Sequence, residues 1–210
     1  GLGMIAGLAK YFFLVLVVLI IHGLVVHPFL LSALARVKPG IFLKKMRDAQ
    51  LFGFSTASSN ATMPITLETV TKRLGVKNSV GSFTVPLGAT INMDGTSIYL
   101  GLVALFAAQA LGIELAMSDY ILIAATATMA SIGAAGIPSA SLFLAVTVLS
   151  VFGVTEQQAV LVIAFIFPFD RLLDMMRTLT NVTGDAAVAT VVGKWEGALD
   201  EDVFREGAKS

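Results

Sequence analysis

The stretch that decides the fold is Phe169-Asp-Arg-Leu-Leu-Asp-Met-Met-Arg-Thr-Leu-Thr-Asn-Val-Thr-Gly-Asp185, where six polar residues interrupt apolar sequence. These six are Asp170, Asp174, Arg177, Thr178, Asn181 and Asp185. At about 100° per residue they fall within an arc of roughly 100° on one side of a helix. One face of this helix is therefore charged, and the rest is apolar.

The composition places this helix in a membrane protein. Of the 210 residues, 56% are hydrophobic and 13% are charged, and the mean hydropathy is +0.86. The formal net charge of zero gives no indication of a nucleic-acid partner, and the absence of cysteine excludes disulfides and thiolate metal sites. Because an ionisable residue within a membrane span is costly, each one is a candidate functional residue.

The first predicted transmembrane helix occupies residues 1–36. Its apolar part exceeds the roughly 20 residues that a span needs, so we expect it to tilt or to emerge at one end. His22 and His27 have no partner at ligand spacing, and we interpret them as structural residues near a helix end or facing another helix. The chain starts with glycine directly on this segment, and we interpret it as a piece of a longer protein.

Residues 37–77 are predicted to form a cytoplasmic loop and a first re-entrant helical hairpin. Basic residues gather at 36–47 and 72–77, as in cytoplasmic loops, and the polar segment 55–64 lies between them. Each arm is too short to cross a hydrocarbon core of about 30 Å at about 1.5 Å per residue. The hairpin therefore enters from the cytoplasm and turns at residues 57–61.

Residues 78–112 are predicted to form an interrupted transmembrane helix. Asn92 and Asp94 would diverge by about 200° on a regular helix, so a shared site requires the helix to unwind there. Gly88 and Gly95 make unwinding easy, and the freed carbonyl oxygens are good ligands for a hard cation.

Residues 113–157 are predicted to form a second re-entrant hairpin, which acts as the outer gate. The loops at 111–119 and 153–158 contain no Lys or Arg, so they are expected outside, and the polar tip at 131–141 separates two short apolar arms. The two hairpins therefore have opposite topology. Paired interruptions in two inverted halves indicate the central binding site of a transporter.

Residues 158–195 form the predicted charged transmembrane helix, and residues 196–210 an acidic, loosely ordered cytoplasmic tail. The predicted fold is an all-α membrane protein with three transmembrane helices, two opposed re-entrant helical hairpins and an unwound middle span.

The charges within these spans indicate bound cations. Asp94, Asp170, Asp174 and Asp185 against Arg177 leave a surplus of three negative charges if all are ionised. Uncompensated burial is prohibitive, so the carboxylates are protonated, paired with other segments or balanced by cations. The last case suits small cations together with a zwitterionic or anionic solute. A purely structural role, in which these groups cross-link helices through hydrogen bonds, remains the alternative.

The motifs resemble the glutamate transporter family, the dicarboxylate/amino acid:cation symporters that include the excitatory amino acid transporters. The resemblance covers nearly the whole chain, as the C-terminal transport core. The matching motifs are Asn92-Met-Asp-Gly-Thr96, the tips at 57–60 and 130–138, and the run from Asp174 through Arg177-Thr178 to Asn181-Val-Thr-Gly-Asp185.

The resemblance implies a substrate site. Arg177 would bind the side-chain carboxylate of the substrate, Asp174 its ammonium group with Thr178 beside it, and Asn181 and Ser59 its α-carboxylate. Relatives specialised for C4-dicarboxylates lack an Asp at position 174, so aspartate or glutamate is favoured over succinate or malate. The full implied set is Arg177, Asp174, Thr178, Asn181, Ser59, Thr96, Ala57 and Ile137.

The chain departs from the family in its arginines. Relatives usually carry one further Arg on the first tip or just before the substrate Arg, where this chain has Ala57 and Met175. That difference concerns release rates and affinity rather than class. Arg171, next to Asp170, is a candidate to neutralise it.

The resemblance also implies sodium as the coupling ion, with no other cofactor. The first site would use the Asp185 carboxylate and carbonyls of Gly88, Asn92 and Asn181. The second would use carbonyls of Thr90, Ser131, Ile132 and Ala134. The third would use Asp94 and Asn92 with residues of an earlier span. Gly133, Gly136 and Pro138 would form the gate.

The sequence therefore predicts a secondary active symporter that couples sodium entry to uptake of L-aspartate or L-glutamate, not an enzyme. Intramembrane proteases carry Gly-x-Gly-Asp, whereas the tetrapeptide ending at Asp185 is Val-Thr-Gly-Asp. The expected setting is the lipid bilayer of the cell (inner) membrane, multi-pass, with a cytoplasmic C-terminus and a homotrimeric full-length protein. The alternatives are a proton-coupled relative, a C4-dicarboxylate symporter and a transport-incompetent fragment.

Overall fold

The computed structural model describes residues 2–206, and within them the chain is helical with no β-strand. The all-α prediction is therefore confirmed. The helices are α1 (Leu2–Ile21), α2 (His27–Leu30), α3 (Pro39–Thr56), α4 (Ser59–Glu68), α5 (Asn78–Ile91), α6 (Asp94–Leu111), α7 (Met117–Ile132), α8 (Ala140–Ser150), α9 (Glu156–Trp195) and α10 (Glu201–Arg205). Three π-helical segments join them, η1 (His22–Val26), η2 (Leu31–Ala35) and η3 (Thr69–Arg73).

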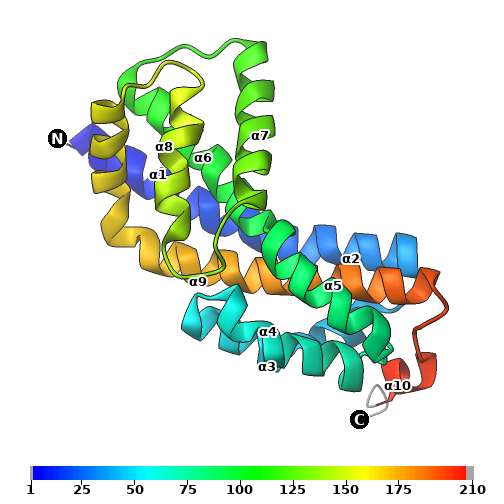
Figure 1. The fold of residues 1–210 in the computed structure, drawn as a ribbon. Helices are drawn as coiled ribbons and strands as arrows, with labels where there is room; N and C mark the ends of the chain where they lie inside the picture. Colours follow the sequence, from blue (N-terminus) through cyan, green and yellow to red (C-terminus); the bar gives the residue numbers. More distant parts are fainter. Residues whose placement is uncertain (1, 207–210) are drawn as a thin grey trace.

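Helix α9 is the element around which the others pack. Its 40 residues correspond to about 60 Å at 1.5 Å per residue. Figure 1 shows α9 running the length of the molecule, with α1, α6 and α8 beside its first half and α3, α4 and α5 beside its second half. Its charged stretch lies in the middle, where these two groups of helices meet.

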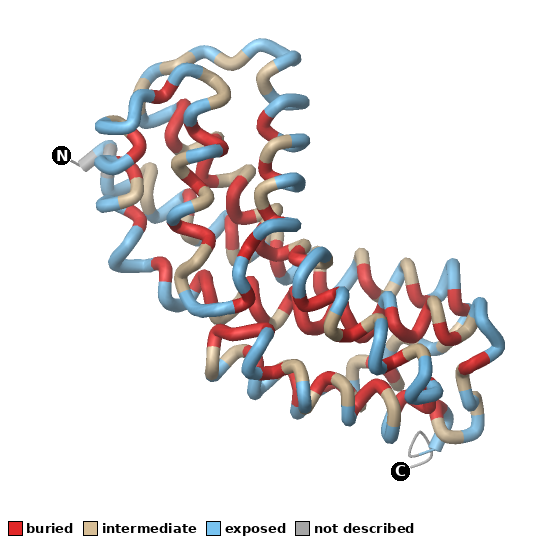
Figure 2. The backbone as a smooth tube through the Cα atoms, in the orientation of Figure 1, coloured by how far each residue is buried: buried red, intermediate tan, exposed pale blue. Residues whose placement is uncertain are grey.

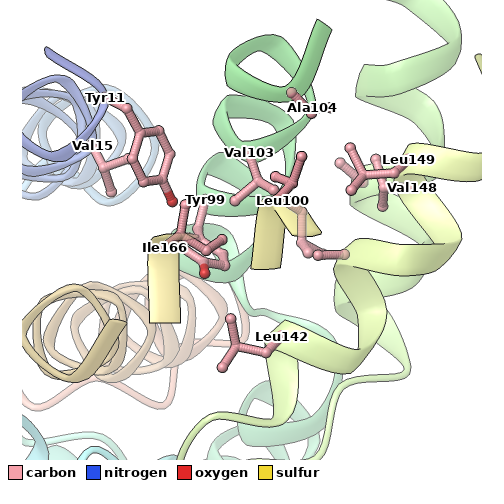
Figure 3. Packing of buried hydrophobic residues seen from close by; sticks show 14 of the residues in the cluster. Tyr11, Val15, Tyr99, Leu100, Val103, Ala104, Leu142, Val148, Leu149 and Ile166 are labelled. Atoms are coloured by element: carbon pink, nitrogen blue, oxygen red, sulfur yellow. The ribbon is translucent and has the colours of Figure 1, made fainter. Parts of the chain in front are cut away.

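Two hydrophobic cores lie on either side of this charged stretch. The first is built from α1, α6, α7, α8 and the start of α9, and Figure 3 shows Tyr99 and Ile166 within it. The second is built from α3, α5, η3 and the end of α9, and contains Phe42, Met46 and Val182. Figure 2 shows buried residues concentrated along the second half of α9. The polar residues at 174–181 therefore fall between two apolar cores.

Helices α3 and α4 pack together as a helical hairpin. The chain turns at Ala57, whose φ of 52° is in the left-handed region, and α4 restarts at Ser59 with the Ser58 hydroxyl accepting from the Ala61 amide at 3.1 Å. The turn is thus two residues long and shorter than the predicted segment 57–61, because a serine cap allows the helix to resume at once.

The interrupted helix predicted for residues 78–112 breaks only at Asn92 and Met93. These two residues have φ near −105° and ψ of 62°, which separates α5 from α6. Pro86 and Gly88 remain inside α5. The break therefore covers only two residues, since α5 ends at Ile91 and α6 begins at Asp94.

Helices α7 and α8 also pack against each other, with a turn at residues 133–139 between them. Ser139, like Ala57, has a positive φ, of 59°. Non-glycine residues in this region carry backbone strain and cluster at functional sites. The α3–α4 turn and the α7–α8 turn therefore each contain one strained residue, Ala57 and Ser139 respectively.

Two helical stretches of the described chain are long and apolar enough to span a membrane, residues 5–35 and 78–111. Large apolar side chains such as Phe13, Phe83 and Phe143 are exposed on the surface. Such a surface is suited to lipid or to other membrane-embedded segments. α9 does not meet the same criterion of length and composition, because its interior carries charges.

The tail is more ordered than predicted. Residues 207–210 lie outside the described part, but Asp200 caps α10, Phe204 is 2% exposed and Val76 forms an antiparallel bridge with Leu199. The Glu201 carboxylate pairs with Lys194 and Arg205. These contacts hold the pKa of Glu201 below its usual range. The expectation of loose order from composition was wrong for residues 196–206 because Phe204 reaches a core.

We expect Lys45→Met to release α10. The Lys45 ammonium donates to the carbonyl oxygens of Arg73 and Val203, both at 2.6 Å, and partial burial lowers its pKa. Losing hydrogen bonds to a charged donor costs about 1.5–3 kcal/mol. Amide exchange in residues 198–206 should accelerate about tenfold or more. Lys72→Met is the control, since its ammonium makes only an exposed pair with Glu68, and equal exchange in both variants would refute the role of Lys45.

Candidate functional site

The tips of the two hairpins touch each other. The Ser58 hydroxyl donates to the carbonyl oxygen of Gly136 at 2.7 Å, and the backbone N–H of Asn60 donates to the same oxygen at 3.2 Å. A Cβ atom on Gly136 would lie 2.7 Å from Asn60 Oδ1, so a larger residue does not fit there. The second tip is therefore hydrogen-bonded directly to the first.

A small cavity lies beneath the two tips. Its volume is about 20 Å³, enough for roughly one water. Seven of the eight residues that the sequence assigned to substrate binding line it. These seven are Ala57, Ser59, Thr96, Ile137, Asp174, Thr178 and Asn181.

Arg177, the eighth, lies directly behind the cavity wall. It is 1% exposed, and its guanidinium donates to Asp174 at 2.7 Å and to Asp170 at 3.2 Å. It also stacks 3.8 Å from the centre of the Tyr99 ring, whose hydroxyl donates to Asp170 at 2.9 Å. Two carboxylates around one guanidinium leave one negative charge in this cluster when all three are ionised.

The proposed pairing of Arg171 with Asp170 is wrong. Arg171 is exposed, whereas Asp170 is 2% exposed and bonds to Tyr99 and Arg177. Adjacent residues on a helix point about 100° apart, so the buried Asp170 is reached by a residue two turns away.

Asn181 joins α9 to the start of α6. Its side-chain oxygen accepts from the Gly95 amide at 2.8 Å, and its side-chain nitrogen donates to Thr96 at 3.2 Å. A Cβ atom on Gly95 would lie 2.7 Å from the Arg177 carbonyl oxygen. Gly95 therefore serves close packing of two helices rather than the unwinding that the sequence suggested.

Asp185 lies one turn further along α9, against the end of α5. Its carboxylate is 2% exposed and accepts from the Asn92 side chain at 3.2 Å. A Cβ atom on Gly88 would lie only 2.6 Å from Asp185 Oδ1. The structure thus brings together Asp185, Gly88 and Asn92, three of the four residues expected at the first sodium site, and Asn181 lies one helical turn before Asp185.

The second set of sodium ligands is less clearly assembled. Ser131 is buried near the end of α7 and Ala134 is buried in the turn that follows, while Thr90 and Ile132 are exposed. α5, which carries Thr90, contacts α7. Of the residues expected to form the gate, Gly133 and Pro138 are exposed in the turn, and Gly136 is buried against the first tip.

Asp94 of the third set faces two histidines. Its Oδ2 atom is 2.9 Å from His27 Nε2 and 3.2 Å from His22 Nε2. The expectation that these histidines face another helix is met, but they share a carboxylate that was assigned to a cation site. The Asn92 side-chain nitrogen donates to Asp185, and it lies beside Gly184 together with Asp94 Oδ2 and His27 Nε2.

Several residues of the site were not found from the sequence. Tyr99 was hidden in an apolar run, Ser58 was quoted only as part of a tip, and the Ser139 amide, which donates to Asp174 at 2.8 Å, has no side-chain signal. Only the spacing of Tyr99, five residues after Asp94 in an otherwise apolar helix, marked it as unusual.

This combination defines the class of protein. Broken helices and helix turns meet at a small cavity with a buried arginine and buried carboxylates, inside an apolar helical shell, as in secondary membrane transporters.

Comparison with known proteins identifies the family. Residues 1–195 match the sodium:dicarboxylate symporter family, and the chain belongs to it. It is 43% identical over 192 residues to excitatory amino acid transporter 1 of Homo sapiens, covering 91% of this chain and 35% of that protein. It is 40% identical over 185 residues to excitatory amino acid transporters of Caenorhabditis elegans and Onchocerca volvulus, covering 88% of this chain and 36% and 37% of those proteins.

The chain spans about a third of the length of these relatives. Its family consists of transporters, so the prediction that it is not an enzyme is confirmed.

Proposed function

We propose that the protein containing this chain is a sodium-coupled symporter for L-aspartate or L-glutamate, and that this chain forms its substrate- and ion-binding core. The observation that carries the proposal is the buried Asp174–Arg177 pair beside the cavity under both tips. A carboxylate and a guanidinium at 2.7 Å provide partners for both charged ends of an acidic amino acid.

The substrate would enter by replacing contacts that now close the cavity. Asp174 Oδ1 is bonded to Arg177, and its Oδ2 accepts from the Ser139 amide of the second tip. The substrate ammonium would take the place of the Ser139 amide at Oδ2. The side-chain carboxylate would bind the guanidinium, while Asn181 and Ser59 orient the α-carboxylate.

The second tip would act as the gate because few bonds hold it. Its closed position depends on the hydrogen bonds from Ser58 and Asn60 to Gly136 and from Ser139 to Asp174. Opening breaks these contacts, admits substrate to a cavity that now has room for about one water, and leaves α9 in place.

Sodium would compensate the buried carboxylates that lack a cationic partner. In the described structure the Asp185 carboxylate has only the side-chain NH₂ of Asn92 as a hydrogen-bonding partner. A cation bound at Asp185, Gly88, Asn92 and Asn181 would neutralise this carboxylate. The sets Thr90, Ser131, Ile132 and Ala134, and Asp94 with Asn92, are the proposed second and third sites.

We place the chain in the cell membrane with both hairpins re-entrant and the C-terminus in the cytoplasm. The spans are residues 1–36, 78–112 and 158–195, and the hairpins lie within 37–77 and 113–157. The full-length protein would be a homotrimer. The basic run at residues 36–47 next to the first span supports this orientation.

The function is tested with the full-length protein in sealed liposomes. Uptake of radiolabelled L-aspartate and L-glutamate is measured while the sodium and proton gradients are varied independently. We expect accumulation of substrate above its outside concentration to require an inward sodium gradient and to stop when sodium is equal on both sides at zero membrane potential.

Two results would contradict the proposal. Uptake driven equally well by a proton gradient without sodium would identify a proton-coupled symporter. Uptake of succinate without aspartate or glutamate would identify a dicarboxylate carrier and remove the role given to Asp174.

A further inference from the structure

A cluster of metal-binding side chains lies outside the substrate cavity. His22 from η1, His27 from α2 and Asp94 from α6 each offer one ligand atom, and these atoms lie within 4.8 Å of one another. Both Nε2 atoms point at the same Asp94 oxygen, at 3.2 and 2.9 Å. The two rings pack edge to face with centres 4.7 Å apart.

The ligand types select a particular class of metal. Imidazole nitrogens suit zinc and its neighbours among the transition metals, whereas sodium prefers oxygen ligands. Ligands about 2.0–2.1 Å from a tetrahedral zinc ion are roughly 3.3 Å apart. The two nitrogen–oxygen separations are within a few tenths of an ångström of that spacing, and all three ligand atoms lie within 4.8 Å of one another, so an ion would be admitted by drawing the two imidazole nitrogens together around it.

Helix α9 leaves space for the cluster because Gly184 faces it. A Cβ atom on Gly184 would lie 2.8 Å from Asp94 Oδ2 and 3.1 Å from His27 Nε2. Any side chain at this position would push into the ligands. The side chains of His22 and Asp94 are 22% and 24% exposed, which leaves a way in, while that of His27 is 2% exposed.

The protonation states are compatible with metal binding. A hydrogen bond from a histidine to the Asp94 carboxylate requires a proton on Nε2 of that histidine. A metal ion bound at Nε2 replaces this proton, so a neutral ring must then carry its proton on Nδ1. The Nδ1 atom of His27 is buried without a hydrogen-bond partner. Moving the proton there breaks no existing hydrogen bond at Nδ1, but it leaves that N–H without an acceptor, a cost of about 1–3 kcal/mol that the bond to the metal has to exceed.

We propose that His22, His27 and Asp94 form a binding site for a divalent transition metal of the zinc class, with the fourth position taken by water. The site rests on geometry and does not depend on the transport function. If Asp94 also serves the third sodium site, which does rest on the proposed function, zinc would displace that sodium ion and inhibit uptake.

Cobalt provides the direct test, because tetrahedral Co²⁺ absorbs visible light and substitutes for zinc. Purified full-length protein is titrated with Co²⁺ without substrate or sodium, and the absorption band is then bleached with Zn²⁺. We expect a band in the wild type and at least about tenfold weaker Co²⁺ binding in His27→Gln and His22→Gln. Asp202→Asn, an exposed carboxylate far along the chain, should bind as the wild type does.

Gly184→Ala is the second variant, since it keeps all three ligands and only fills the space beside them. It should also weaken the band, and circular dichroism and size-exclusion chromatography establish that each variant is folded. A wild type that shows no band at saturating Co²⁺, or a His27→Gln protein that binds Co²⁺ as tightly as the wild type, would overturn the proposal.

Sodium distinguishes this inference from the transport proposal. If Asp94 is shared, adding sodium should raise the Co²⁺ concentration needed for half-saturation, and Zn²⁺ should inhibit sodium-driven uptake less in His27→Gln than in the wild type. Co²⁺ binding with the same affinity in the presence and absence of sodium would support the metal site and remove its link to transport. Sodium-driven uptake by a protein that does not bind Co²⁺ would overturn the metal site alone.

Discussion

Arg177→Ala is expected to lower sodium-driven uptake of L-aspartate at least about a hundredfold. Removing the guanidinium takes away the proposed partner of the substrate carboxylate, where a hydrogen bond between charged groups is worth about 1.5–3 kcal/mol, and it leaves Asp170 and Asp174 buried without a cationic partner; each 1.4 kcal/mol corresponds to a factor of ten. It also removes the only cationic side chain of the described residues that contacts Asp174. The measurement is initial uptake in liposomes, with the amount of folded protein determined by size-exclusion chromatography.

Two further variants separate charge from geometry. Arg177→Lys keeps the positive charge but loses the planar pair of donors and the stacking on Tyr99, so most of the loss should remain. Arg171→Ala removes an exposed arginine from the same helix and should transport normally. Normal aspartate uptake by a folded Arg177→Ala protein would show that the substrate carboxylate binds elsewhere.

Asp185→Asn is expected to raise the sodium concentration for half-maximal uptake by at least about tenfold. The Asp185 carboxylate is buried, and its single hydrogen bond from Asn92 does not neutralise it. Asparagine has nearly the same size and lacks the charge, so the variant tests the charge alone. Because a buried charge without a partner is costly, a sodium ion should be bound there in the transporting state.

The readouts for Asp185→Asn are the sodium dependence of uptake and the sodium-induced rise in melting temperature, both of which should weaken. Asp202→Asn, which removes an exposed carboxylate near the end of α10, should change neither. An unaltered sodium dependence in Asp185→Asn would exclude this carboxylate as a sodium ligand.

Period and composition were sufficient to predict much of the chain. The six polar residues of α9 could be assigned to one face because helix geometry fixes their directions; all six are buried, and Asp174, Thr178 and Asn181 line the cavity. The helix break was predicted near Asn92 and Asp94 because both cannot face one site from a regular helix. The tips were predicted because polar, turn-forming residues separate short apolar arms.

Contacts between distant segments were decided only by the tertiary structure. The sequence determined that the chain is helical and apolar, and which residues of α9 share a face, because these properties depend on neighbours a few positions away. That Asp170 meets Tyr99, that two histidines share Asp94, that the Ser139 amide caps Asp174 and that Phe204 orders the tail depend on packing between segments 35 or more residues apart in the chain. No local periodicity encodes such pairings, since they follow from how whole helices fit together.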